Sequence, residues 1–157
     1  MEKIMEARYD VKTIINYIIA YSNDCELEIT NLVVQKILYY IQGYFIKINN
    51  ALAFDSDIYK WPYGPVVPTA YFELCANRNQ PIYFEKSERE KYLEDTTINR
   101  KDRNLINTII KKCNSLGVTQ LVNGTHNQLP WKNAEMKKMI QIESIIDYFE
   151  ENNPLEI

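Results

Sequence analysis

Histidine and cysteine, the side chains that most often carry catalysis or bind a metal ion, are scarce in this chain. It has one histidine, His126, and three cysteines, Cys25, Cys75 and Cys113. A single histidine excludes the H-E-x-x-H zinc motif, and the wide separation of the cysteines excludes a C-x-x-C zinc or redox pair. We therefore expect no metal and no cofactor.

His126 is the one candidate for acid–base catalysis, with Cys113 or a serine as the attacking nucleophile. No serine stands in a G-x-S-x-G elbow, and no cysteine stands in a recognisable protease motif. In Thr125-His126-x-x-x-Pro130-Trp131 we interpret the imidazole as a hydrogen-bonded, buried or capping group. The chain is thus expected not to be an enzyme, and a reaction centred on His126 is kept as an alternative.

The glycines exclude the common nucleotide-binding loops. Gly43, Gly64, Gly117 and Gly124 are too widely spaced to form either the G-x-x-x-x-G-K-[ST] phosphate loop or the G-x-G-x-x-G dinucleotide turn. Since zinc, redox and nucleotide motifs are all absent, the sequence favours a function in binding over one in catalysis.

Charge does not indicate a nucleic-acid partner. The 18 basic and 21 acidic side chains among 157 residues give a net charge of −3. The one candidate for a DNA-binding helix is the basic segment Arg100-Lys101-Asp102-Arg103 with Lys111 and Lys112. We interpret this segment as a solvated helix face because no aromatic residues are interleaved with it. A DNA-binding or regulatory protein is kept as a second alternative.

The most specific local pattern is Trp61-Pro62-Tyr63-Gly64-Pro65-Val66-Val67-Pro68. Three prolines and a glycine hold two aromatic side chains in a nearly rigid turn, and rigid aromatics are binding anchors of low entropic cost. Large aromatics are also commonly buried, so Trp61 and Tyr63 are alternatively interpreted as core residues beside a strand. The sequence leaves both roles open.

Hydrophobic periodicity predicts the helices that position these residues. Apolar residues at helical spacing predict a helix behind the N-cap Asp10 and a longer, largely buried helix behind Thr30 that ends at Asn49 and Asn50. A third helix is expected to begin at Pro68, and a fourth to run from Leu105 to a left-handed stop at Gly117. Three more are predicted at 118–126, from Pro130 onward, and around 142–149.

Two short strands are expected at 58–61 and 82–84, where they would pair with each other, and prolines predict irregular backbone from 62 to 68. The polar segment 87–103 is expected to be exposed and helical or irregular. Together these features predict a mainly α fold, α+β at the margin. We expect a compact single-domain bundle of about six to seven helices with a short two-stranded β-hairpin, one domain over residues 1–157 with its core at about 10–150.

An odd number of widely spaced cysteines indicates reduced thiols, as in a cytoplasm. The N-terminus carries no apolar export signal, and the longest apolar runs, such as 37–41, are far shorter than the ~20 residues that cross a bilayer. We expect a cytoplasmic protein without membrane contact.

Three blocks of this sequence, in this order, resemble the Panacea family of SocA-like antitoxin domains over about residues 10 to 150. They are Gln35-Lys36-x-Leu38-Tyr39-Tyr40, Trp61-x-Tyr63-Gly64-Pro65-Val66, and Thr125-His126-x-x-x-Pro130-Trp131. The chain departs from the family pattern at Val33, where lysine is frequent, at Lys60, where alanine is frequent, and at Pro62, where a polar residue is usual.

The resemblance implies a mainly helical protein that binds and neutralises a toxin encoded in the same operon. It does so by direct occlusion or as an adaptor that hands the toxin to an ATP-dependent protease. Many members are encoded in prophages or mobile elements, and the family brings no catalytic residue. The oligomeric state and the toxin's identity stay open. The residues implied as partner-binding or family-motif positions, whether scaffold or interface, are Gln35, Lys36, Tyr39, Trp61, Tyr63, Gly64, Pro65, Thr125, His126, Pro130 and Trp131.

Overall fold

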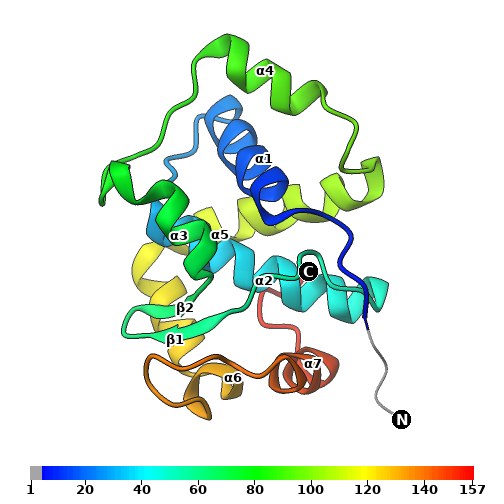
Figure 1. The fold of residues 1–157 in the computed structure, drawn as a ribbon, viewed down its shortest axis with the longest axis vertical. Coiled ribbons are helices and arrows are strands. Elements are labelled where there is room, and N and C mark those ends of the chain that lie inside the picture. The colour runs from blue at the N-terminus through cyan, green and yellow to red at the C-terminus, as the bar shows by residue number, and fades with distance from the viewer. Residues whose placement is uncertain (1–4) are drawn as a thin grey trace.

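Helix α2 (Asn31–Asn49) is the element around which the others pack in the computed structural model, which describes residues 5–157. The predicted N-cap is confirmed, because the Thr30 hydroxyl accepts a hydrogen bond from the Val33 amide. Asn50 ends the helix in the left-handed conformation, with φ of 52°. Every residue at positions 33–46 is buried, so neighbouring elements surround most of this helix. Figure 1 shows α2 lying across the middle of the molecule.

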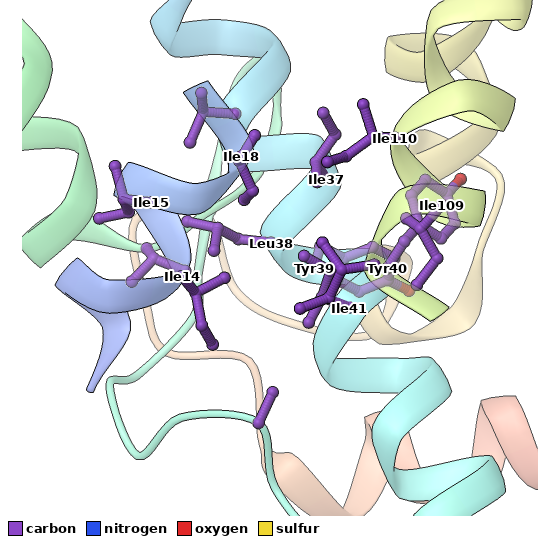
Figure 2. Packing of buried hydrophobic residues seen from close by; sticks show 14 of the residues in the cluster. Ile14, Ile15, Ile18, Ile37, Leu38, Tyr39, Tyr40, Ile41, Ile109 and Ile110 are labelled. Carbon is purple, nitrogen blue, oxygen red and sulfur yellow. The ribbon is translucent and has the colours of Figure 1, made fainter. Parts of the chain in front are cut away.

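Helix α1 (Val11–Asp24) and helix α5 (Arg100–His126) supply the isoleucines that cover α2. Asp10 caps α1 as predicted, since its carboxylate accepts from the Lys12 amide at 2.8 Å. Figure 2 shows side chains of α1, α2 and α5 meeting in one apolar cluster. Its labelled members are Ile14, Ile15, Ile18, Ile37, Leu38, Tyr39, Tyr40, Ile41, Ile109 and Ile110.

Helix α5 consists of two helical halves that meet at Gly117, where the sequence predicts one helix to end and the next to begin. The break is confirmed, because the Gly117 backbone leaves the helical region with φ of 79° and ψ of 164°. The positive φ was expected of this glycine, but its ψ is extended and not left-handed helical. The kink turns the second half of α5 toward the β-hairpin, as Figure 1 shows.

The hairpin consists of β1 (Tyr59–Trp61) and β2 (Gly64–Val66), which pair antiparallel. The predicted pairing of 58–61 with 82–84 is therefore wrong, as is the irregular backbone predicted for all of 62–68. Lys60 lies opposite Pro65, one step from the turn pair. Bonded and non-bonded pairs alternate in an antiparallel ladder, so a proline at this position removes no hydrogen bond between the strands. Its carbonyl faces away from β1, toward α2.

The segment 82–84 has other partners for its backbone groups. The Ile82 amide donates to the Ile29 carbonyl at 2.8 Å. The side-chain amide of Asn23 donates to the Ile82 carbonyl at 3.0 Å and accepts from the Phe84 amide at 2.7 Å. These bonds fasten the segment to the end of α1 and to the loop that follows it, and not to the hairpin.

A second segment, 137–140, lies along the outer edge of β1. The Lys60 amide donates to the Lys138 carbonyl at 2.9 Å, and the Lys60 carbonyl accepts from the Lys137 amide at 2.7 Å. The Ile140 amide donates to the Ile58 carbonyl at 2.7 Å. The outer edge of β1 is therefore not free, and the short hairpin gains the support that two isolated strands lack.

The remaining elements complete a mainly α fold. The seven α-helices and two-stranded sheet of residues 5–157 confirm the predicted class and helix number. Pro68 begins a helix as predicted, the exposed segment 87–103 is helical over most of its length, and Pro130 lies in the first turn of a short helix. These elements are α3 (Pro68–Leu74), a 3-10 turn (Cys75–Asn77), α4 (Lys86–Glu94), α6 (Leu129–Lys132) and α7 (Ile142–Glu151).

Helix α7 packs on α2 at a glycine. The Phe149 ring is fully buried and meets the rings of Tyr39, Tyr40 and Tyr44 edge to face. A Cβ atom at Gly43 would overlap the Phe149 ring. Glycine at this point in α2 is therefore required for close approach of the two helices.

We expect Gly43→Ala to lower the free energy of unfolding by about 1–3 kcal/mol, because the added methyl group overpacks the contact with Phe149. Gly124→Ala is the matched control, since that glycine is also helical and its Cβ would meet only the Tyr40 hydroxyl, at 3.8 Å. It should raise stability by about 0.5–1 kcal/mol through helix propensity. Urea unfolding measures both, and equal effects of the two changes would contradict the packing argument.

Candidate partner-binding site

Gln35 connects the first half of α2 to the segment that follows the hairpin. Its side-chain oxygen accepts from the Val67 amide at 2.9 Å, and its nitrogen donates to the Asn31 side chain at 2.9 Å. Asn31 in turn donates to the Tyr71 carbonyl at 3.1 Å. Both amide side chains are buried, so α3 is attached to α2 through hydrogen bonds shielded from water.

Lys36 is a lysine buried to 1% exposure, and its ammonium nitrogen donates to the Pro65 carbonyl at 3.0 Å. Burial lowers the pKa of this amine to about 7, because removal from water disfavours the charged form. The contact reaches from the first half of α2 to the middle of β2. The bond gives a partner to the Pro65 carbonyl of β2, which points away from β1.

Gly64 permits this close approach. Its φ of 118° lies where side chains rarely fit. A Cβ there would also lie 2.7 Å from Lys36 Cε and 2.9 Å from Thr125 Oγ1. The hairpin, α2 and α5 therefore meet at one point that only glycine leaves open.

The end of α5 is held by buried polar side chains. The Tyr39 hydroxyl donates to Gln128 Oε1 at 2.7 Å, and Gln128 Nε2 donates to the Tyr40 hydroxyl at 3.0 Å. The Thr125 hydroxyl bonds back to helix carbonyls at 3.0 and 3.1 Å. These contacts fix the third motif block against the first.

His126 and Lys60 lie against the indole of Trp131. The imidazole stacks on the indole with ring centroids 4.1 Å apart and 21° between planes. The Lys60 ammonium lies 4.0 Å from the centre of that ring and donates to the Ala134 carbonyl at 3.1 Å. Trp131 Nε1 donates to the Trp61 carbonyl at 3.0 Å, so the stack is attached to β1.

The predicted hydrogen bond of the imidazole is not found at Nε2, which is buried without a partner among residues 5–157. Burial lowers the pKa of His126, the charges of Lys36 and Lys60 lower it further, and the nearby Pro62 backbone opposes these effects. Burial, the largest of these effects, favours the neutral imidazole. Cys113, its candidate nucleophile, is fully buried on the other side of the Gly117 kink, and burial raises the pKa of its thiol.

The aromatic residues of the hairpin divide between packing and solvent. Tyr63 at the turn is 69% exposed, which excludes the core role that was one interpretation of this residue. Trp61 is half-buried and packs edge to face against Tyr71 and Phe72, at centroid distances of 5.0 and 6.3 Å. Phe72 itself is 64% exposed. An exposed aromatic surface thus runs over the hairpin and the adjoining helix α3.

The candidate residues accordingly fall into two groups. The residues buried within the fold are Gln35, Lys36, Tyr39, Gly64, Pro65, Thr125 and Pro130. The half-buried or exposed residues are Trp61, Tyr63, His126 and Trp131. Sequence reasoning missed Phe72 and Lys60 as site residues. A spacing pattern carries no signal for them, because Phe72 meets Trp61 through the packing of α3 beside the hairpin, and Lys60 meets a tryptophan that is distant in the chain.

The basic segment of α5 lies apart from this site. Asp102 is buried within it and accepts two hydrogen bonds from Arg8 at 3.0 Å and one from the Tyr9 hydroxyl at 2.6 Å. The segment therefore also fastens the chain ahead of α1. Within residues 5–157 no three histidine, cysteine or acidic side chains are grouped to hold a metal ion. In the same part of the chain, no helix is both long and apolar enough to cross a bilayer.

Comparison with known proteins identifies the family. The model of the SocA-like antitoxin family, Panacea domain, matches residues 34–132. The chain belongs to this family. No curated protein and no solved structure matches it. The Panacea segment runs from the first turn of α2 to the end of α6, so it contains every candidate residue, while α1 and α7 lie outside it.

Family membership assigns an antitoxin-like role in general terms, and families of this kind typically have a protein partner such as a toxin. Such antitoxins are typically not enzymes. In this Panacea protein the motif residues of α2 connect the hairpin and the end of α5 to one helix. These α2 residues hold in place the elements that carry the exposed aromatic side chains.

We expect the free energy of unfolding to rise between about pH 7 and pH 9 through Lys36. In this interval the unfolded amine, with its ordinary pKa of 10.5, is protonated while the folded amine, near 7, is losing its proton. The slope approaches about 1.4 kcal/mol per pH unit. Lys36→Met should remove it from urea-unfolding measurements, and Lys101→Met, at an exposed position, should keep it. An unchanged slope in Lys36→Met would contradict this assignment.

Proposed function

We propose that this protein is an antitoxin that binds a cognate toxin encoded in the same operon and neutralises it by covering the surface the toxin acts with. Membership of the SocA-like antitoxin family is the observation that carries this proposal. Two features of the site support it. The polar side chains of the motif are used within the fold, and the exposed side chains are aromatic.

Exposed aromatics on a rigid support suit stoichiometric binding. Protein interfaces place desolvated aromatic side chains at their centre and polar groups around them. Trp61 and Phe72 pack against each other, so little side-chain freedom is lost when a partner covers them. Binding by preformed groups of this kind requires no catalytic residue.

Delivery of the toxin to an ATP-dependent protease is a second mode of the same function. Occlusion predicts an inactive toxin with an unchanged lifetime, whereas delivery predicts that the toxin disappears. In either mode we propose that the whole chain acts as one domain in the cytoplasm. Helices α1 and α7 lie outside the family-matched segment but pack on α2. This packing supports a single domain that includes both helices. A prophage or mobile element is the proposed genetic setting.

Co-expression tests the function directly. The product of the neighbouring gene should stop growth when induced alone, and growth should return when this protein is induced with it. The two proteins should co-purify at a fixed ratio. Toxin lifetime in cells with and without the protease then separates occlusion from delivery. A neighbour that is harmless alone, or that stays lethal and unbound beside this protein, would overturn the proposal.

We expect His126→Gln to keep neutralisation while lowering stability. Glutamine cannot stack on Trp131 as the imidazole does, so the end of α5 should loosen. Thermal unfolding measures stability, and growth rescue measures function. Asn127→Ala, at the adjacent exposed position, is the control and should change neither. A stably folded His126→Gln protein that no longer neutralises the toxin would favour a reaction centred on His126.

A further inference from the structure

An open groove of about 430 Å³ runs between the hairpin and α3. We call it the hairpin groove. It is lined by Asp57, Tyr59, Trp61, Pro68, Thr69 and Lys137. These residues come from β1 and the approach to it, from the start of α3, and from the segment that lies along the outer edge of β1.

The order of charges along the groove follows from the strand. Asp57, Tyr59 and Trp61 are two residues apart, so extended backbone places them on one face in a row of roughly 13 Å, at about 3.3 Å per residue. The Lys137 amide donates to the Lys60 carbonyl at 2.7 Å, which places Lys137 at the Trp61 end of this row. The groove therefore has a carboxylate at one end, two aromatic rings in its floor and an ammonium group at the other end.

We propose that the hairpin groove binds an extended segment of the toxin, about four residues long, that carries an apolar side chain between an acidic and a basic residue. The apolar side chain lies over Trp61 and Tyr59, the acidic residue pairs with Lys137, and the basic residue pairs with Asp57. This inference rests on the proposed function and names the surface and the partner chemistry that the function requires.

Charge complementarity favours a peptide of this kind over other occupants. A nucleic-acid strand would place phosphates along the whole row and meet the Asp57 carboxylate, in a protein with a net charge of −3. A peptide can present opposite charges at its two ends. The exposed Phe72 ring, edge-on to Trp61, extends the apolar floor beyond the groove and adds area for the rest of the toxin.

Two variants test the groove, each with a matched control of the same chemistry elsewhere on the surface. Lys137→Glu reverses the charge at one end and Thr69→Trp fills the groove, while Lys101→Glu and Thr119→Trp make the same changes at exposed positions of α5. Binding to the purified toxin is measured by calorimetry, after thermal unfolding has shown that each variant is folded.

We expect both groove variants to weaken binding at least tenfold and both controls to stay within twofold of wild type. The effect of Lys137→Glu should shrink as salt is added, because a partly exposed ion pair is screened. Wild-type binding by a folded Thr69→Trp protein would overturn the groove proposal while leaving the antitoxin function intact. If the wild type is a dimer, and Thr69→Trp makes it monomeric without loss of toxin binding, then the groove binds a second copy of this chain. Absence of toxin binding by the wild type would instead refute the proposed function.

Discussion

The hydrogen bond from buried Lys36 to the Pro65 carbonyl is the contact on which the exposed part of this structure depends. A three-residue strand with a proline at its centre has few interactions of its own. The long side chain of Lys36 passes beside Gly64 and attaches this strand to α2, the most buried helix. An amine in this place is costly to bury, and the cost is limited because its pKa near 7 lets it lose its charge.

The aromatic surface is rigid because both edges of the hairpin are occupied. Lys36 and Gln35 hold the β2 side to α2, and the backbone at 137–140 holds the β1 side. The indole of Trp131 supports the hairpin through the Trp61 carbonyl and is itself covered by His126 and Lys60. Lys36 and His126 are side-chain types that could suggest catalysis when only the sequence is read. In the structure they help to position the aromatic side chains that face solvent.

Local signals in the sequence sufficed for the starts of α1 and α2. Caps at Asp10 and Thr30 and the periodic isoleucines belong to one stretch of chain each, and the structure confirms them. The hairpin partner could not be predicted in this way, because β2 is held by a hydrogen bond to the Pro65 carbonyl from Lys36, which is 29 residues away in the chain. Gly117 was identified as a special position, yet the kink it makes depends on what the second half of α5 packs against.

The family resemblance located the motif residues but not their orientations. Burial of Lys36 and exposure of Tyr63 are decided by the assembled core, which no single block of sequence contains. Lys137 carried no signal, since 137–140 has no strand-like alternation and joins β1 through backbone atoms alone.

The two walls of the hairpin groove differ in how freely they can evolve. The wall made by β1 and α3 lies inside the family-matched segment and is connected to the buried polar side chains of α2. The wall made by Lys137 lies beyond residue 132, and it is the backbone of this segment that bonds to β1. A lineage can therefore retain the scaffold and acquire a new recognition preference by replacing side chains in this short C-terminal stretch.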